Sequence, residues 1–116
     1  LGLAADNRRD LLDWAEVRKM KDSGLVRFGS HTCNHTRLVE GLDEALIVRE
    51  IEGSRTRLED ELGESARFFC YPNGDCSAAA LARVRACYSG AVSTQIGWND
   101  VTATPRGFRA RLTGWL

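Results

Sequence analysis

The chain has no surplus of charge of either sign. Its 116 residues include 16 lysines and arginines and 16 aspartates and glutamates, so the formal net charge is zero. Electrostatic capture of nucleic acid or of an anionic membrane depends on a basic surplus, so neither is an expected partner. No apolar run approaches the roughly 20 residues of a membrane span, and we expect none in this segment.

The four cysteines lack the spacing of a metal ribbon or a redox motif. Cys33, Cys70, Cys76 and Cys87 include no C-x-x-C pair, which excludes a zinc ribbon and a thioredoxin-type motif. Cys70 and Cys87 lie in apolar or small-residue stretches, which favours buried free thiols over the alternative of a disulfide framework. Cysteine usage therefore leaves the cell compartment open.

Histidine is scarce, and both histidines fall in one short segment. His31 and His35 stand four residues apart, after the apolar run 25–28. Two imidazoles at this spacing can point at one metal ion, and a preceding strand would place them at the sheet edge where α/β proteins keep their sites. The alternative is a pair of surface histidines that bind nothing, because they supply only two of the three ligands of a catalytic zinc.

The first half of the chain predicts two helices with a strand between them. Asp13 and Glu16 form a capping box for a helix that stops near Gly24, and an apolar strand is expected over 25–30. A longer helix is expected from about 43 to 62.

The charged residues of this longer helix are interpreted as an ordinary solvated face. They are Glu50, Arg55, Arg57, Glu59 and Asp60. A glycine inside a helix costs about 0.5–1 kcal/mol relative to alanine, so Gly53 predicts a close packing contact at its position.

The second half predicts further alternation of strands and helices. A short strand over 68–71 is followed by a turn at 72–74, a helix capped by Ser77 that runs to about Cys87, and a strand over 91–94. This order favours parallel strands with helical crossovers. A doubly wound sheet and a β/α barrel both fit it, but an eight-fold barrel needs ~250 residues. We therefore expect a small open α/β unit or a slice of a larger barrel.

Two motifs, in order, resemble those of one known family. Residues 28–35 (FGSHTCNH) are similar to the metal-binding motif of the polysaccharide deacetylases, the NodB-homology or carbohydrate esterase family 4 enzymes. Residues 69–74 (FCYPNG) resemble the family's groove motif, and 87–93 resemble its strand after the third helix. The resemblance covers about 14–106. It implies an α/β fold that is part of a deformed (β/α) barrel of the polysaccharide deacetylase type.

The resemblance also implies a site. His31 and His35 would be metal ligands, with zinc the usual divalent ion, and an aspartate would be the general base. The backbone N–H of Asn73 would hold the oxyanion, and Arg106 would orient the base. The residues that the resemblance places along the substrate groove are Tyr71, Pro72 and Gly74. Trp98 is a further groove candidate because aromatic faces pack against sugar rings, and the alternative is a core or rim role.

Two parts of the family's catalytic set are not recognisable in the chain. Neither Asp6 nor Asp10 ends an apolar strand, as the family's paired aspartates do, and there is no third histidine to act as general acid. We therefore expect 1–116 to be a single partial domain, with both ends of the barrel missing. It would belong to a metal-dependent hydrolase that removes N- or O-linked acetyl groups from a polysaccharide, and the chain alone would be inactive. The family favours an extracytoplasmic or cell-envelope location, although this segment shows no signal peptide.

Other interpretations stay open on sequence alone. The chain could be a degenerate carbohydrate-binding module that keeps the groove but not catalysis, or a small structural metal site. Without the histidines, residues 72–74 would read as a simple β-turn. Cys33 is an alternative third ligand, whereas Asp75 and Asp100 are interpreted as turn or surface residues.

Overall fold

The computed structural model describes residues 11–94. The first helix is α1 (Trp14–Asp22), and a longer helix combines α2 (Glu44–Val48), the π-helical turn η2 (Arg49–Gly53) and α3 (Ser54–Leu62). Then follow β1 (Phe68–Cys70), the 3-10 turn η3 (Pro72–Gly74), α4 (Ala78–Cys87) and β2 (Gly90–Val92). No helix within 11–94 is long and apolar enough to cross a membrane.

The helix termini follow the predicted capping residues. The Glu16 N–H donates to Asp13 Oδ1 over 2.8 Å and the Asp13 N–H donates to Glu16 Oε2 over 2.9 Å, which completes the capping box of α1. The side chain of Asp43 caps α2, and Gly63, at φ +66°, ends α3 in the left-handed conformation that favours glycine. Ser77 caps α4 by accepting from the Ala80 N–H. The predicted helices are therefore confirmed, while the π-helical turn within the long one was not expected.

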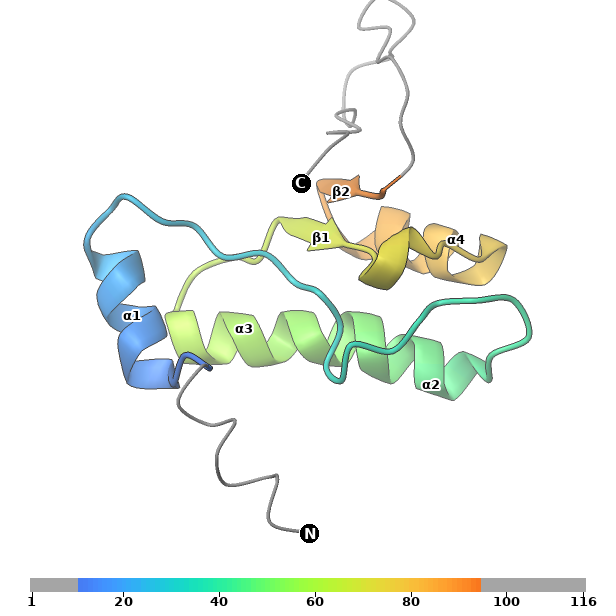
Figure 1. Ribbon diagram of the computed structural model, residues 1–116, viewed down its shortest axis with the longest axis horizontal. Coiled ribbons are helices and arrows are strands. Elements are labelled where there is room, and N and C mark those ends of the chain that lie inside the picture. Colours follow the sequence, from blue (N-terminus) through green and yellow to red (C-terminus); the bar gives the residue numbers. More distant parts are fainter. Residues whose placement is uncertain (1–10, 95–116) are drawn as a thin grey trace, which may run out of the picture.

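Polar contacts hold α1 against the C-terminal end of α3 (Figure 1). The guanidinium of Arg57 lies 5.5 Å from the centre of the Trp14 ring, within cation–π range. The Lys21 ammonium donates to Leu62 O over 2.9 Å, where a helix leaves its last carbonyls unpaired. These contacts orient α1 so that the segment after it runs back across the long helix toward β1.

The strands pair in parallel, as expected, but one predicted strand is nearly absent. β1 and β2 are in parallel register, with Phe69 opposite Ala91. The strand expected over 25–30 is reduced to a single bridge, in which the Ser30 N–H donates to Phe68 O and Ser30 O accepts from the Cys70 N–H, both over 2.8 Å. Leu25 is 90% exposed. Apolar sequence alone does not make a strand where only its last residue meets a partner.

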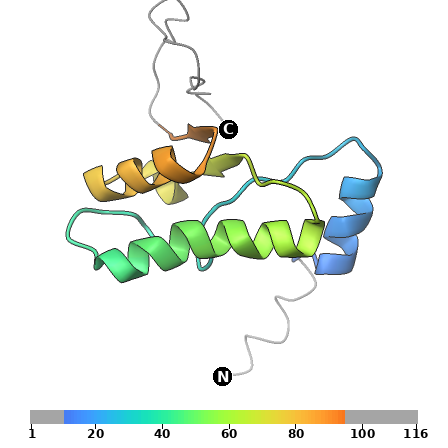
Figure 2. The same ribbon diagram turned by 180° about the vertical axis from the view of Figure 1, so that it is seen from behind.

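The long helix and α4 cover one face of the strand pair (Figures 1 and 2). Alternation along β1 turns Phe69 and Tyr71 toward these helices and leaves Phe68 54% exposed on the other face. The buried cluster consists of Leu38, Ile47, Ile51, Phe69, Tyr71, Ala80, Val84 and Tyr88.

Candidate functional site

The two histidines lie together on an exposed loop after the Ser30 bridge. The ring centres of His31 and His35 are 4.8 Å apart, and the rings meet edge to face at 70°. Two residues of this loop, Thr32 and His35, have positive φ values of 69° and 57°. Non-glycine residues visit this region rarely, so the surrounding contacts have to hold the loop in this shape.

His31 is anchored at the C-terminal end of β1. Its Nδ1 lies 2.8 Å from the carbonyl oxygen of Cys70, the last residue of that strand. A carbonyl can only accept, so Nδ1 carries the proton and the lone pair of the neutral ring is on Nε2. A backbone partner of this kind is the usual outer contact of a metal-binding histidine.

Glu50 of η2 holds the loop between the histidines. One oxygen, Oε2, accepts from the backbone N–H groups of Cys33 over 3.1 Å and of Asn34 over 2.9 Å. The other oxygen, Oε1, accepts from the Asn34 side-chain amide over 2.7 Å. Glu50 is only 1% exposed, so its assignment to the solvated face was wrong. Its position three residues after Ile47 and directly before Ile51 places it on the buried stripe, a signal present in the sequence.

The hydrogen bonds favour the charged form of this carboxyl group. Burial raises the pKa of Glu50, but the hydrogen bonds from the side chain and backbone of Asn34, from Thr36 and from the backbone of Cys33 together lower it below its ordinary value. Glu50 is therefore held as a carboxylate whose lone pairs face the histidine loop.

Cys33 points to the long helix. Its thiol donates to Arg49 O over 3.4 Å, and a methyl group built on Gly53 would lie 3.6 Å from its sulfur. Burial raises the pKa of the Cys33 thiol, and the neighbouring Glu50 charge adds to this effect, which disfavours the thiolate that binds metal. The contact at Gly53 is of ordinary length, so the close packing predicted for that glycine is not present.

The turn after β1 lies at the same end of the strand as His31. The Gly74 N–H donates to Tyr71 O over 2.9 Å and the Asp75 N–H donates to Pro72 O over 3.1 Å, so these two bonds do not use the Asn73 N–H. Asn73 is left-handed, with φ 54°, and exposed. Asn73 lies three residues after Cys70 in the chain, and the carbonyl of Cys70 is the one that anchors His31.

Three contacts join the segment after the histidines to the segment after the turn. The Arg37 guanidinium meets both carboxylate oxygens of Asp75, over 2.6 and 3.3 Å, and lowers the pKa of that carboxyl. Two further links run from the Ser77 N–H to Leu38 O and from the Ala78 N–H to a Glu40 oxygen, both over 2.8 Å. The loop and the turn are therefore held against each other, and Asp75 belongs to this contact.

Not every expected site residue is open to a ligand. Tyr71 and Pro72 are buried, because the same alternation that buries Phe69 turns Tyr71 inward. Neither side chain is open to a ligand among the described residues, and their place along a substrate groove stays a prediction. Gly74 is half-buried. Trp98 and Arg106 lie outside the described residues, as do Asp6, Asp10 and Asp100.

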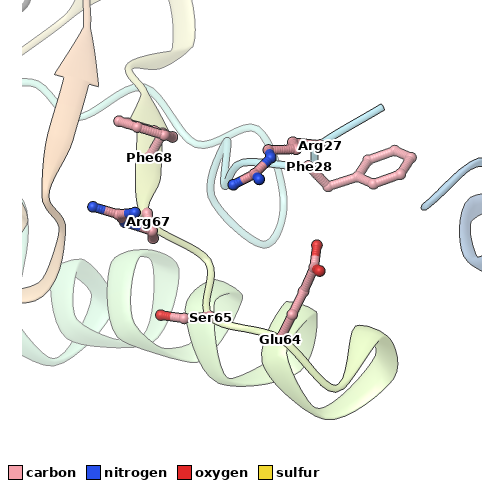
Figure 3. Close-up of a pocket in the computed structure, with 6 residues that line it drawn as sticks. All are labelled: Arg27, Phe28, Glu64, Ser65, Arg67 and Phe68. Carbon is pink, nitrogen blue, oxygen red and sulfur yellow. The ribbon is translucent and has the colours of Figure 1, made fainter. Parts of the chain in front are cut away.

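A cavity of about 190 Å³ lies at the opposite end of β1 (Figure 3). Phe68, the first residue of β1, lines this cavity, whereas His31 is hydrogen-bonded to Cys70, the last residue of that strand, and the 72–74 turn follows the strand in the chain. Its lining residues are Arg27, Phe28, Glu64, Ser65, Arg67 and Phe68. None of the predicted site residues that lie within 11–94 contributes to this cavity.

The histidine pair fits part of a zinc site. Imidazole nitrogen is a preferred zinc ligand, the Nε2 lone pair of His31 is set by its Nδ1 contact, and the His35 ring lies beside it. Within residues 11–94, no group of three or more histidine, cysteine, aspartate or glutamate side chains is placed to hold a metal. The described residues thus offer two nitrogen donors, where a catalytic zinc site uses three protein ligands.

Most of the chain matches the model of one protein family. Residues 2–89 match the model of the polysaccharide deacetylases. This covers most of the 116 residues, so the chain belongs to the polysaccharide deacetylase family. No curated protein matches it.

Solved structures agree with this assignment. The chain is similar to a polysaccharide deacetylase from Bacillus cereus, with 26% identity and a TM-score of 0.71 over 81% of this chain and 29% of that one. It is similar to the Streptococcus pyogenes deacetylase PplD in complex with acetate, with 28% identity and a TM-score of 0.67 over 74% and 38%. IcaB from Ammonifex degensii, at 22% identity, shares the fold, with a TM-score of 0.68 over 73% and 41%. The α/β fold of this chain is part of the deacetylase barrel, and the chain spans well under half of these proteins.

Proposed function

We propose that this chain is part of a metal-dependent hydrolase that removes acetyl groups from a polysaccharide. The observation that carries the proposal is the placement of His31 and His35, which lie 4.8 Å apart between ring centres and are tied to the end of β1 just before the 72–74 turn. Family membership supports the substrate class, since the matched model is that of polysaccharide deacetylases.

The histidines and the Cys70 carbonyl each have a definite role in this proposal. His31, through Nε2, and His35 would hold the ion, and the Cys70 carbonyl would keep the His31 ring in its metal-binding tautomer. The expected ion is divalent zinc. When bound, it would polarise the acetyl carbonyl and lower the pKa of a water molecule.

The Asn73 N–H would donate to the oxygen that becomes negative when water attacks the acetyl carbon. A preorganised donor of this kind stabilises the developing charge, and a backbone donor does not depend on the side chain at this position. The contact between Arg37 and Asp75 would keep this turn against the histidine loop. The third ligand and the general base are not assigned to any residue within 11–94.

The test is acetate release from acetylated chitooligosaccharides and acetylated xylan by the protein that contains this chain. We expect zinc-dependent release that is abolished by His31→Ala/His35→Ala, while the 116-residue chain alone releases little, since it brings two ligands from its described part. Glycan binding without release by the containing protein would support the carbohydrate-binding alternative. Release that is unchanged in the double variant would contradict the proposal.

A further inference from the structure

We propose that Glu50 is a positioning residue that sets the geometry of His31 and His35 for the metal. The inference rests on the proposed function and deepens it, because it assigns the control of that site to a buried carboxylate on another element. Glu50 contacts neither imidazole. It acts through the loop that joins them.

The contacts of Glu50 fall on the two residues at the middle of that loop. Its oxygens accept from the backbone N–H of Cys33, from the backbone N–H of Asn34 and from the Asn34 side chain, over 3.1, 2.9 and 2.7 Å. These three donors lie between the two histidines in the chain, and the Thr36 side chain, which also hydrogen-bonds Glu50, directly follows His35. The carboxylate therefore fixes the peptide groups that determine where each imidazole is directed.

The loop needs such a contact because its flanking residues are unusual. Thr32 and His35, on either side of the Glu50 contacts, are both left-handed, a conformation that a free loop of non-glycine residues populates little. Two backbone N–H groups that point at one carboxylate oxygen select this conformation over extended ones. The loop then places both rings against each other at the end of β1.

The other end of the contact is buried. Glu50 lies in the π-helical turn η2, is 1% exposed, and is followed by Ile51, which is fully buried in the core. A π-helical turn inside an α-helix is uncommon and is often found at functional sites. The carboxylate thus connects the histidine loop to the buried core, which a surface ion pair would not do.

The experiment compares zinc affinity among folded variants of the full chain by calorimetry. Glu50→Leu keeps the size of the side chain but cannot accept hydrogen bonds, and we expect zinc to bind about 10- to 100-fold more weakly, the usual effect of removing an outer-shell partner. Glu50→Gln can still accept from both backbone N–H groups through its carbonyl, and Asn34 can turn its amide to accept from the new NH₂. We expect it to stay within about 3-fold of wild type.

The matched control is Glu52→Leu, two residues along the same turn. Glu52 pairs with Arg83 over 3.0 Å, and no hydrogen bond or ion pair joins it to the described histidine loop, so its replacement should leave zinc affinity unchanged even if it lowers stability. Urea unfolding of each variant separates a loss of stability from a loss of affinity. Hydrogen exchange of the Cys33 and Asn34 amides, followed by NMR without metal, should speed up in Glu50→Leu and not in Glu52→Leu.

The outcomes separate this inference from the proposed function. Wild-type affinity in folded Glu50→Leu would overturn the positioning role alone. If that variant does not fold, Glu50→Asp is the second test, because its shorter side chain withdraws the carboxylate from the Cys33 and Asn34 backbone N–H groups, and wild-type affinity there would overturn the positioning role equally. Absence of zinc binding by the wild-type chain would overturn the metal site of the proposed function, and with it the role of Glu50.

Discussion

Gly53 and Gly74 differ in what they require of the chain at the level of a single residue. Gly74 has φ +77°, and a methyl group there would lie 2.8 Å from the backbone nitrogen of Thr94 and in contact with that side chain. Gly53 has helical φ and ψ angles, and a methyl group there would make only an ordinary contact with the Cys33 sulfur. Gly74 is required by conformation and space, whereas Gly53 is not.

Alanine substitutions at these two positions should therefore have opposite effects on stability. We expect Gly74→Ala to lower the free energy of unfolding by more than about 1 kcal/mol, because both the left-handed backbone and the Thr94 contact oppose it. Gly53→Ala should raise it by about 0.5–1 kcal/mol, since alanine costs the helix less than glycine. Urea denaturation of both variants gives the two values, and a loss of stability in Gly53→Ala would contradict the geometry at the histidine loop.

Single residues also mark how far the sequence predicts the site. His31 and His35 are found by their type and spacing, because few other patterns bring two imidazoles together. Glu50 was assigned to a solvated face, since charged residues on a helix are usually exposed. Its position on the stripe of Ile47 and Ile51 was a local signal of burial, but its partners lie on a loop about 16 residues earlier in the chain, and local periodicity does not reveal such partners.

At the level of elements, Glu59 joins the end of α3 to the segment that leads into β1. One of its oxygens accepts from the Arg55 guanidinium over 2.8 Å and from the Ala66 N–H over 3.1 Å. The hydrogen bond from Arg55 lowers the pKa of Glu59 below its ordinary value of 4.5, with smaller contributions from Ala66 and Ser65. The charged form is therefore bound more favourably in the folded chain than in the unfolded one.

This arrangement predicts a loss of stability in acid. Because the folded-state pKa is lowered, the contribution of Glu59 is fully present above 4.5 and is lost as the pH falls through the lower folded-state value. The free energy of unfolding should therefore decrease as the pH falls below about 5. We expect Glu59→Gln to show a smaller decrease than wild type in urea unfolding measured across this range. The exposed Glu64→Gln is the matched control for the loss of one carboxylate, and an equal decrease in wild type and Glu59→Gln would contradict this account.

Helices were predicted better than strands, for a physical reason. The capping residues Asp13, Asp43 and Ser77 act on backbone groups two or three residues away, so the sequence nearby contains the whole signal. A strand over 25–30 would need a neighbouring strand along its whole length, and within the described residues only Ser30 pairs with one. The inward direction of Phe69 and Tyr71 likewise depends on which face the long helix and α4 cover.

At the scale of the whole molecule, the chain carries one part of a larger architecture. It spans 29% of the Bacillus cereus polysaccharide deacetylase and 38% of the Streptococcus pyogenes deacetylase PplD. The described part includes a histidine pair, a turn held against it and a buried carboxylate behind it. The family and the fold are established by the match over residues 2–89 and by these structures. The role of the histidine pair is the claim on which the proposed function depends.

Zinc titration of the 116-residue chain, followed by calorimetry, tests that claim most directly. The wild-type chain should bind one zinc ion, weakly, because its described residues offer two ligands where a catalytic site uses three. His31→Ala/His35→Ala should lose this binding while it keeps the wild-type helical circular dichroism, since both side chains are exposed. Equal zinc binding by the wild type and a folded double variant would contradict the account.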